Sequence, residues 1–287
     1  MRTRSLLAAV AMVAAVSPSS RAETRGPATG TLFIVGGGMR DRALVKRFID
    51  LAGGPDAPIV IVPTAGDDDT YAQDYPGTKQ FRDAGARRIT VLHTRDPKVA
   101  DTEAFVAPLT TARGVFFQGG RQWRIADAYL GTRTQREVAR VLERGGVVGG
   151  TSAGATILGS FLVRGDTKGN ELMVGDHLVG FGLLTDSAID QHLLRRNRQF
   201  DLVPVIAERP QLLGIGIDED TAIVVTQTAF DVLGNGYVAV YDGARGQDPP
   251  GGFYLLAPGD HFDLAARTAT RNPGGKPLDG VKRGPRP

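Results

Sequence analysis

The sequence contains no cysteine. This absence excludes a thiol nucleophile, a thiolate zinc site and a disulfide framework. A chain of 287 residues can nevertheless bury enough apolar surface to fold without cross-links. The sequence beyond the N-terminus also lacks an apolar run of about 18 residues, so no membrane-spanning helix is predicted there. No repeat of roughly 20–50 residues recurs, which argues against a solenoid or a propeller.

The N-terminus has the pattern of a signal peptide. Arg2 and Arg4 precede the apolar stretch 6–16, which is too short to span a membrane as a helix, and the small residues Ser20 and Ala22 follow it. We therefore expect residues 1–22 to be removed after Ala22, giving a secreted or periplasmic protein without membrane attachment. The alternative interpretation is a buried N-terminal helix.

The charge balance gives no support for a nucleic-acid partner. The full chain carries a net charge of +3, but residues 1–22 contribute three arginines and no acidic residue. The remaining chain therefore has equal numbers of basic and acidic residues. Residues 271–287 are rich in glycine, proline and basic residues, and we expect them to form a disordered basic tail. Residues 23–270 are predicted to form a single domain.

Buried strands alternate with helical segments through the first half of the chain. This alternation predicts an α/β fold in which a mostly parallel sheet lies between helical layers. After residue 214 the pattern changes to short strands separated by glycine-containing turns, which we expect to form hairpins on the edge of the same mixed sheet. The predicted strands are 31–35, 58–62, 89–92, 114–117, 147–149, 215–217, 222–226, 237–241 and 253–256, and the predicted helices include 42–52, 125–130 and 135–144.

The strongest local motif is Gly-Thr-Ser-Ala-Gly at residues 150–154. It follows a predicted strand and precedes a predicted apolar helix, which is the context of a nucleophile elbow. The glycines would allow a sharp turn that presents Ser152 at the carboxyl edge of the sheet, where the helix N-terminus favours negative charge. The alternative is a tight strand-to-helix junction in which Ser152 only caps the helix.

A nucleophilic serine needs a base and a carboxylate that orients the base. Of the four histidines, His192 is favoured by its place after an apolar run and before an arginine-rich stretch that we expect to be helical; the other candidates are His93, His177 and His261. The acidic turn 218–220 follows a predicted strand, so one of its carboxylates could face the site. A solvated acidic turn is the other interpretation.

Three further segments, rich in glycine or aspartate, are candidates for an oxyanion hole, a cofactor site and a metal site. The pair Gly119-Gly120 follows a buried strand, and the backbone N–H groups of Gly120 and Ala153 could form an oxyanion hole, although a plain turn is equally possible. Residues 36–38 form an incomplete dinucleotide-binding fingerprint, because Asp41 stands where its third glycine belongs. The acidic run 67–69 lacks further ligands at usable spacing. We therefore predict neither a cofactor nor a metal.

Four motifs in order together resemble the cyanophycinase branch of the serine peptidases, which also includes dipeptidase E. They are residues 117–122, 150–155, 190–192 and 214–222. The resemblance implies a three-layer α/β/α sandwich related to the glutamine amidotransferase-like fold. It also implies that Ser152 is the nucleophile, His192 the base and Glu219 the orienting carboxylate. This order of residues differs from that of the α/β-hydrolases.

The same resemblance implies a substrate and a set of binding residues. Cyanophycin is a poly-aspartate with arginine on each β-carboxyl group, and the family releases β-aspartyl-arginine dipeptides from it. The implied substrate-binding residues are Gln122, Asp190, Gln191, Arg196 and Arg198. A homodimer is also suggested.

Two positions depart from the family pattern and make the substrate an open question. Arg121 stands where an acid is usual, and Asp201 stands where a third arginine is expected. Each change reverses a charge in the implied pocket. A peptidase for short aspartyl or isoaspartyl peptides is therefore an alternative, as is a catalytically inactive secreted binding protein on the same fold.

Overall fold

The computed structural model describes residues 23–243 and 252–274. Its strands are β1 (Thr31–Val35), β2 (Pro58–Val62), β3 (Arg88–Val91), β4 (Gly114–Phe117), β5 (Val147–Thr151), β6 (Gly159–Phe161), β7 (Leu184–Gln191), β8 (Leu213–Ile217), β9 (Thr221–Val225), β10 (Ala229–Gly234), β11 (Val238–Asp242), β12 (Tyr254–Leu256), β13 (His261–Asp263) and β14 (Thr268–Thr270). Its helices are α1 (Arg42–Ala52), η1 (Pro76–Thr78), α2 (Lys79–Asp83), α3 (Pro97–Ala100), α4 (Glu103–Thr111), α5 (Gln122–Tyr129), α6 (Arg133–Glu143), α7 (Ala153–Thr156) and α8 (Leu202–Glu208).

The described strands form two sheets rather than the single mixed sheet that the sequence suggested. The nine-stranded sheet has the order β14-β13-β10-β9-β1-β5-β4-β2-β3, and the five-stranded sheet has the order β12-β11-β8-β7-β6. In the large sheet β1, β5, β4, β2 and β3 run parallel, as predicted, and β9, β10, β13 and β14 continue it antiparallel. The α/β class is therefore confirmed. The error in sheet number arises because successive late strands pair in different sheets.

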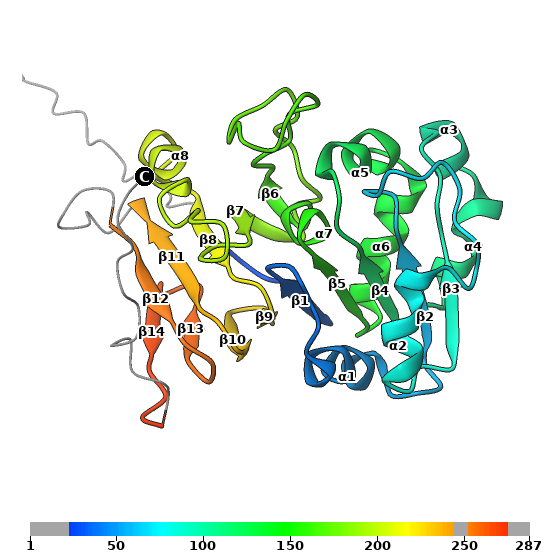
Figure 1. The fold of residues 1–287 in the computed structure, drawn as a ribbon, viewed down its shortest axis with the longest axis horizontal. Helices are drawn as coiled ribbons and strands as arrows, with labels where there is room; N and C mark the ends of the chain where they lie inside the picture. Colours follow the sequence, from blue (N-terminus) through cyan, green and yellow to red (C-terminus); the bar gives the residue numbers. More distant parts are fainter. Residues whose placement is uncertain (1–22, 244–251, 275–287) are drawn as a thin grey trace, which may run out of the picture.

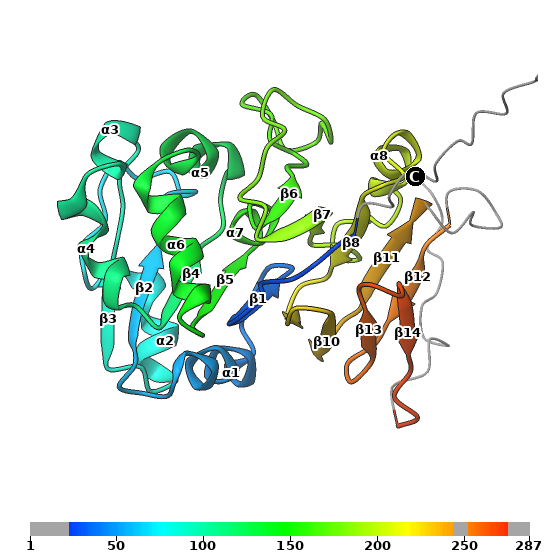
Figure 2. The ribbon, with the colours of Figure 1, turned by 180° about the vertical axis from the view of Figure 1, so that it is seen from behind.

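Helices cover both faces of the parallel strands (Figures 1 and 2). Side chains alternate along β1: Phe33 and Val35 pack in the core beneath α1, whereas Leu32 and Ile34 pack in the core shared with α4, α5 and α6. On the α1 side, the ring of Phe48 lies edge-on to Phe116, 5.1 Å away between centroids. A Cβ on Gly149 of β5 would lie 3.1 Å from that same Phe48 ring, so α1 packs closely under the strand that precedes Ser152.

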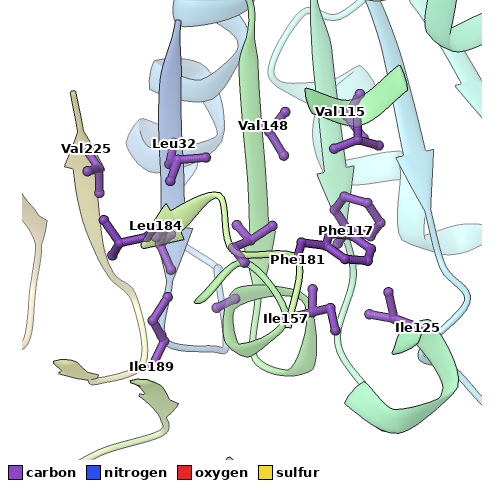
Figure 3. Close-up of a cluster of buried hydrophobic side chains, with 14 of the residues drawn as sticks. Leu32, Val115, Phe117, Ile125, Val148, Ile157, Phe181, Leu184, Ile189 and Val225 are labelled. Atoms are coloured by element: carbon purple, nitrogen blue, oxygen red, sulfur yellow. The ribbon is translucent and has the colours of Figure 1, made fainter. Parts of the chain in front are cut away.

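The second sheet packs against the antiparallel side of the first. Phe230 and Val232 of β10 share one buried core with Ile215 of β8 and Val240 of β11. Figure 3 shows the neighbouring part of this core, where side chains of β1, β4, β5, β7 and β9 converge. Helix α8 covers the other face of the small sheet, where its buried apolar residues contact β11. This packing holds β7 and β8 of the small sheet in place beside the parallel strands.

The described part of the chain is held at both of its ends. The Thr24 hydroxyl is buried and donates to the Asp186 carbonyl over 3.1 Å. Arg271, where the basic tail was expected to begin, donates to the Asp260 carboxylate over 2.9 Å. The predicted signal peptide and residues 275–287 of the predicted tail lie outside the described residues. Within residues 23–243 and 252–274, no helix has the length and apolar character of a membrane span.

Candidate active site

The predicted catalytic segments all follow strands whose carboxyl ends meet. Val35 of β1 lies beside Thr151 of β5 in parallel register, and Gln191 of β7 lies beside Ile217 of β8. Ser152 and residues 36–38 therefore follow neighbouring strand ends of the large sheet. His192 and residues 218–220 likewise follow neighbouring strand ends of the small sheet. The carboxyl edge of parallel strands is where ligands bind in α/β proteins.

Ser152 stands in a strained turn between β5 and α7. Its φ of 55° and ψ of −118° are unusual for a residue with a side chain. The turn depends on its glycines, because a Cβ on Gly150 would lie 2.1 Å from the Gly154 carbonyl oxygen, and one on Gly154 equally close to that of Phe117. The Ser152 side chain does not cap α7, so the capping alternative is wrong. Helix α7 is one turn long, which makes its dipole weaker than expected.

Ser152, His192 and Glu219 form one continuous chain of hydrogen bonds. Glu219 Oε1 lies 2.7 Å from His192 Nδ1, and His192 Nε2 lies 2.9 Å from Ser152 Oγ. A carboxylate that accepts the Nδ1 proton leaves Nε2 as an acceptor for the serine hydroxyl. The His192 side chain is 9% exposed, so the arrangement is largely sheltered from water. This is the geometry that activates a serine nucleophile.

The three carboxylates of the acidic turn after β8 accept hydrogen bonds from different parts of the chain. Glu219 faces His192, whereas Asp218 Oδ1 accepts the backbone N–H groups of Leu194 and Arg195 over 3.1 and 3.0 Å. Asp220 Oδ1 accepts the backbone N–H of Arg40 over 2.5 Å. The turn is therefore a folded junction rather than a solvated loop.

The glycine segment 36–38 lies directly against His192 and Glu219, which sequence reasoning did not anticipate. A Cβ on Gly37 would lie 2.3 Å from His192 Cε1, and one on Gly38 would lie 2.8 Å from Glu219 Oε2. The Gly36 carbonyl also accepts the His192 N–H over 2.8 Å, which ties the two sheets together. Three glycines directly after a buried strand could have indicated this close packing, but they were interpreted only as a cofactor-binding motif.

Charge and burial keep the histidine neutral and the glutamate ionised. Burial lowers the pKa of His192, and the positive charges of Arg196 and Arg198 lower it further; together they outweigh the hydrogen bond to Glu219. Burial alone would raise the pKa of Glu219, but its hydrogen bond to His192 and the positive charge of Arg40 bring that pKa below the ordinary value. Both shifts favour a histidine that is ready to accept a proton at neutral pH.

The backbone beside Ser152 offers two amide donors. In the described part of the chain neither the Gly120 N–H nor the Ala153 N–H has a protein acceptor. The Gly119-Gly120 loop passes close to Ser152, since a Cβ on Gly119 would lie 3.1 Å from Ser152 Cβ. Gly120 has φ 143° and a Cβ there would lie 2.0 Å from the Ala65 carbonyl oxygen, so this backbone path requires glycine.

The predicted substrate-binding residues differ in what they can reach. Gln122 is fully buried, and its Nε2 donates to the Val163 carbonyl over 3.0 Å. Arg198 is 4% exposed and donates from Nη1 to Gln191 Oε1 over 2.9 Å. Arg196, by contrast, is exposed. The stretch after His192 is a series of turns rather than the expected helix, since His192 and Asn197 both adopt positive φ.

Asp190 is held in a buried ion pair that sequence reasoning missed. Its two carboxylate oxygens accept from Arg164 Nε and Nη2 over 2.7 and 2.9 Å, and both side chains are essentially inaccessible. Arg164 Nη2 also reaches Asp201 Oδ2 at 2.5 Å, so the charge of Asp201 that departed from the family pattern has a partner. A lone arginine inside an apolar segment was the only signal for this contact. Arg121, the other departure, donates to the Asp166 carbonyl over 2.8 Å.

The remaining histidines and the acidic run have other partners. His93 contacts Thr64, His177 lies between Asp127 and Asp176, and His261 contacts Asp231. In the run 67–69, Asp67 pairs with Arg124 over 2.6 Å and Asp69 with Arg95 over 2.8 Å. Across the part of the chain that the structure describes, no three acidic or histidine side chains gather as a metal site.

Comparisons with known proteins agree with this geometry. Residues 32–233 match peptidase family S51. Curated proteins named cyanophycinase are similar: that of Geminocystis herdmanii is 31% identical over 221 residues, covering 74% of this chain and 80% of the relative. That of Nostoc sp. is 32% identical over 271 residues, covering 86% and 90%. A crystal structure of a peptidase from an acI-B1 actinobacterium has a TM-score of 0.64 at 21% identity, covering 85% of this chain and 98% of its own, and shows the same fold.

Proposed function

The chain belongs to peptidase family S51 and is a serine-type peptidase; from that premise we propose that it hydrolyses cyanophycin to β-aspartyl-arginine dipeptides through an acyl-enzyme on Ser152. The single observation that carries the proposal is the hydrogen-bonded chain from Ser152 through His192 to Glu219. A binding protein would have no use for a strained serine aimed at a buried, oriented imidazole.

The first half of the reaction forms the acyl-enzyme. Ser152 Oγ attacks the scissile carbonyl carbon while its proton passes to His192 Nε2. Glu219 stabilises the imidazolium that results, and the free amides of Gly120 and Ala153 would hold the oxyanion. The tetrahedral intermediate then collapses: the C–N bond breaks, the carbonyl re-forms, and His192 returns its proton to the leaving amine.

The second half repeats these steps with water. A water molecule gives a proton to His192 Nε2 and attacks the acyl carbon, and the ester bond to Ser152 Oγ breaks as that oxygen regains the proton. The carboxylic acid product leaves and the hydroxyl is restored. The neutral form of His192, which its lowered pKa favours, is the form needed in both halves.

The charges near the catalytic group support an anionic substrate region. Arg196 is exposed, and the guanidinium of Arg40 lies 3.8 Å from Glu219 Oε2. Guanidinium groups bind carboxylates well, and each arginine of cyanophycin carries a free carboxylate. Asp190 has both oxygens engaged by Arg164, so we assign it to positioning rather than to substrate contact.

We also propose that the protein is exported. The support is the sequence pattern of residues 1–22, and a chain that begins at Glu23 would keep the docked residue Thr24. Release outside the cytoplasm suits an enzyme that degrades an external polymer. Detecting an N-terminus at Glu23 in protein from the periplasm or the medium would support export; an uncleaved protein in the cytoplasm would contradict it.

Ser152→Ala tests the catalytic proposal. The purified wild-type protein is incubated with insoluble cyanophycin and the released products are identified by mass spectrometry. We expect β-aspartyl-arginine from the wild type and a loss of at least about 10³-fold in the variant, because removing a triad nucleophile leaves only binding and oxyanion stabilisation. Labelling of the wild type, but not of the variant, by a serine-reactive phosphonate is the accompanying control.

The same assay separates the alternatives. Hydrolysis of short aspartyl or isoaspartyl peptides with no product from cyanophycin would replace the proposed substrate but keep the mechanism. A wild-type protein that neither cleaves a peptide nor takes up the phosphonate would instead be a binding protein. Near-wild-type activity in the Ser152→Ala variant would reject the acyl-enzyme scheme itself.

A further inference from the structure

We propose that Arg164 is a positioning residue that fixes the end of β7, and with it His192, for catalysis. This inference rests on the proposed role of Ser152 and His192. Arg164 lies after β6, has no exposed surface, and touches neither Ser152 nor His192 in the contacts that the structure gives. Its influence must therefore act through other residues.

One guanidinium joins three separate parts of the chain. Nε and Nη2 grip the Asp190 carboxylate near the end of β7, and Nη2 also reaches Asp201 at the start of α8. Nη1 donates to the Asn170 carbonyl over 2.9 Å, and the Arg164 backbone N–H donates to the Met173 carbonyl over 3.0 Å. The side chain thus fastens the 164–173 loop and α8 to the strand that leads to His192.

Asp190 passes this constraint along the backbone. Its Oδ1 accepts the Gln191 N–H over 2.9 Å as well as the Arg164 Nε–H. Gln191 in turn accepts Arg198 through Oε1, and the next residue is His192. A carboxylate locked by two parallel hydrogen bonds cannot rotate, so the peptide that carries Gln191 into His192 has a fixed orientation. The orientation of His192 is thereby set by the end of β7 as well as by its hydrogen bond to Glu219.

Only arginine can make this set of contacts. Its planar fork places two donors against one carboxylate and leaves a third nitrogen for the Asn170 carbonyl, whereas a lysine ammonium is a single point charge on a flexible stem. Two carboxylates share the one buried cation, so losing its positive charge would leave Asp190 buried and unpaired. Replacing Arg164 by lysine therefore keeps the positive charge and removes the paired hydrogen bonds to Asp190.

The test is Arg164→Lys, with Arg267→Lys as the matched control. Arg267 forms a second buried pair, with Asp242, over 2.6 Å. Asp242 lies beside Leu213 at the first residue of β8, whereas Glu219 follows the last, so this pair is at the far end of the strand. We expect Arg164→Lys to lower kcat by about 10²-fold, the order expected when reacting groups are displaced by ~1 Å. Arg267→Lys should lower Tm and leave kcat and KM unchanged.

The readouts are kcat, KM and the rate at which the phosphonate labels Ser152, each measured well below the Tm of every variant. Slower labelling and lower kcat in Arg164→Lys alone support positioning. Unchanged constants in that variant, or equal losses in both lysine variants, overturn it. A wild-type protein that is not labelled would instead contradict the proposed function, which keeps the two failures distinct.

Asp201→Asn provides a second route if Arg164→Lys does not fold. The Asp201 side chain is 36% exposed, and Arg164 stays paired with Asp190 in the amide variant, so the substitution leaves no buried charge unpaired. We expect this variant to fold and to lose several-fold in the labelling rate, since one anchor of the guanidinium is weakened. A labelling rate equal to that of the wild type would overturn the role of the network.

Discussion

At the scale of single residues, the site is defined by side chains whose protonation is set by their neighbours. His192 is buried between Ser152 and Glu219 and lies within the field of Arg196 and Arg198. Its neutral form is the base, so activity should rise with pH as the imidazole loses its proton. Because the pKa of His192 is lowered, this rise should occur at lower pH than for an ordinary histidine.

Arg196→Gln tests this electrostatic effect. The substitution removes a positive charge that lowers the pKa of His192, so that pKa should rise and the acid limb of kcat/KM should move to higher pH. The measurement is the pH profile of kcat/KM at low salt. Because Arg196 is exposed, the difference between the two proteins should shrink as ionic strength increases.

Arg87→Gln is the charge-matched control for that experiment. Arg87 is an exposed arginine before β3, paired with Asp56 at the amino ends of the strands. Its removal should leave the acid limb in place. An acid limb that is unchanged in Arg196→Gln, or that moves to lower pH, would contradict the electrostatic explanation.

At the scale of elements, the site depends on turns in which a side chain would collide with the catalytic group. Residues 36–38 were set aside as a poor cofactor motif, yet they pack against His192 and Glu219. The motif at 150–154 was predicted correctly as a sharp turn after a strand, although α7 is shorter than expected. Local sequence therefore identified glycine-rich strand ends, but not what packs against each glycine.

Gly37→Ala should reduce activity through crowding of the base. A Cβ at residue 37 would lie 2.3 Å from His192 Cε1, so the imidazole must move away from Ser152 or the backbone must shift. We expect kcat to fall by about 10²-fold, as for other ~1 Å displacements of catalytic groups. The measurement is steady-state kinetics with the Tm of each variant.

Gly85→Ala controls for the backbone strain alone. Gly85 also has positive φ, at 111°, but a Cβ there meets nothing within 4 Å. This variant should lose about 1 kcal/mol of stability with unchanged kcat, which is the ordinary cost of a side chain at such a backbone angle. Equal kinetics in the two alanine variants would show that residue 37 does not crowd His192.

At the scale of the whole molecule, the proposed catalytic group is assembled from two sheets. Ser152 comes from the nine-stranded sheet, and His192 and Glu219 come from the five-stranded one. The N-terminal segment 23–26 links the same two sheets at the opposite end. The Arg25 N–H donates to the Thr185 hydroxyl of β7 and the Arg25 carbonyl accepts the Thr185 N–H, while the Gly26 N–H donates to the Gln227 carbonyl between β9 and β10.

Deleting that segment should weaken the fold without altering the chemistry. A chain that begins at Pro27 loses these bonds and the buried Thr24 hydroxyl contacts, so we expect it to be about 5 kcal/mol less stable than a chain that begins at Glu23, at roughly 1 kcal/mol per hydrogen bond. Denaturant unfolding measures this difference. Equal stability of the two chains would show that the segment does not hold the sheets together.

The sequence by itself determined the buried parallel strands and the turn at Ser152, and it favoured His192 among the four histidines as the base. Those features follow from local apolar runs, glycine spacing and the order of motifs, all of which are readable along the chain. Tertiary structure alone decided that successive late strands enter different sheets, that glycines 36–38 pack against His192 and Glu219, and that Arg164 pairs with both Asp190 and Asp201. Such contacts join residues far apart in sequence, and their energy depends on distance and burial, which the linear order of residues does not specify.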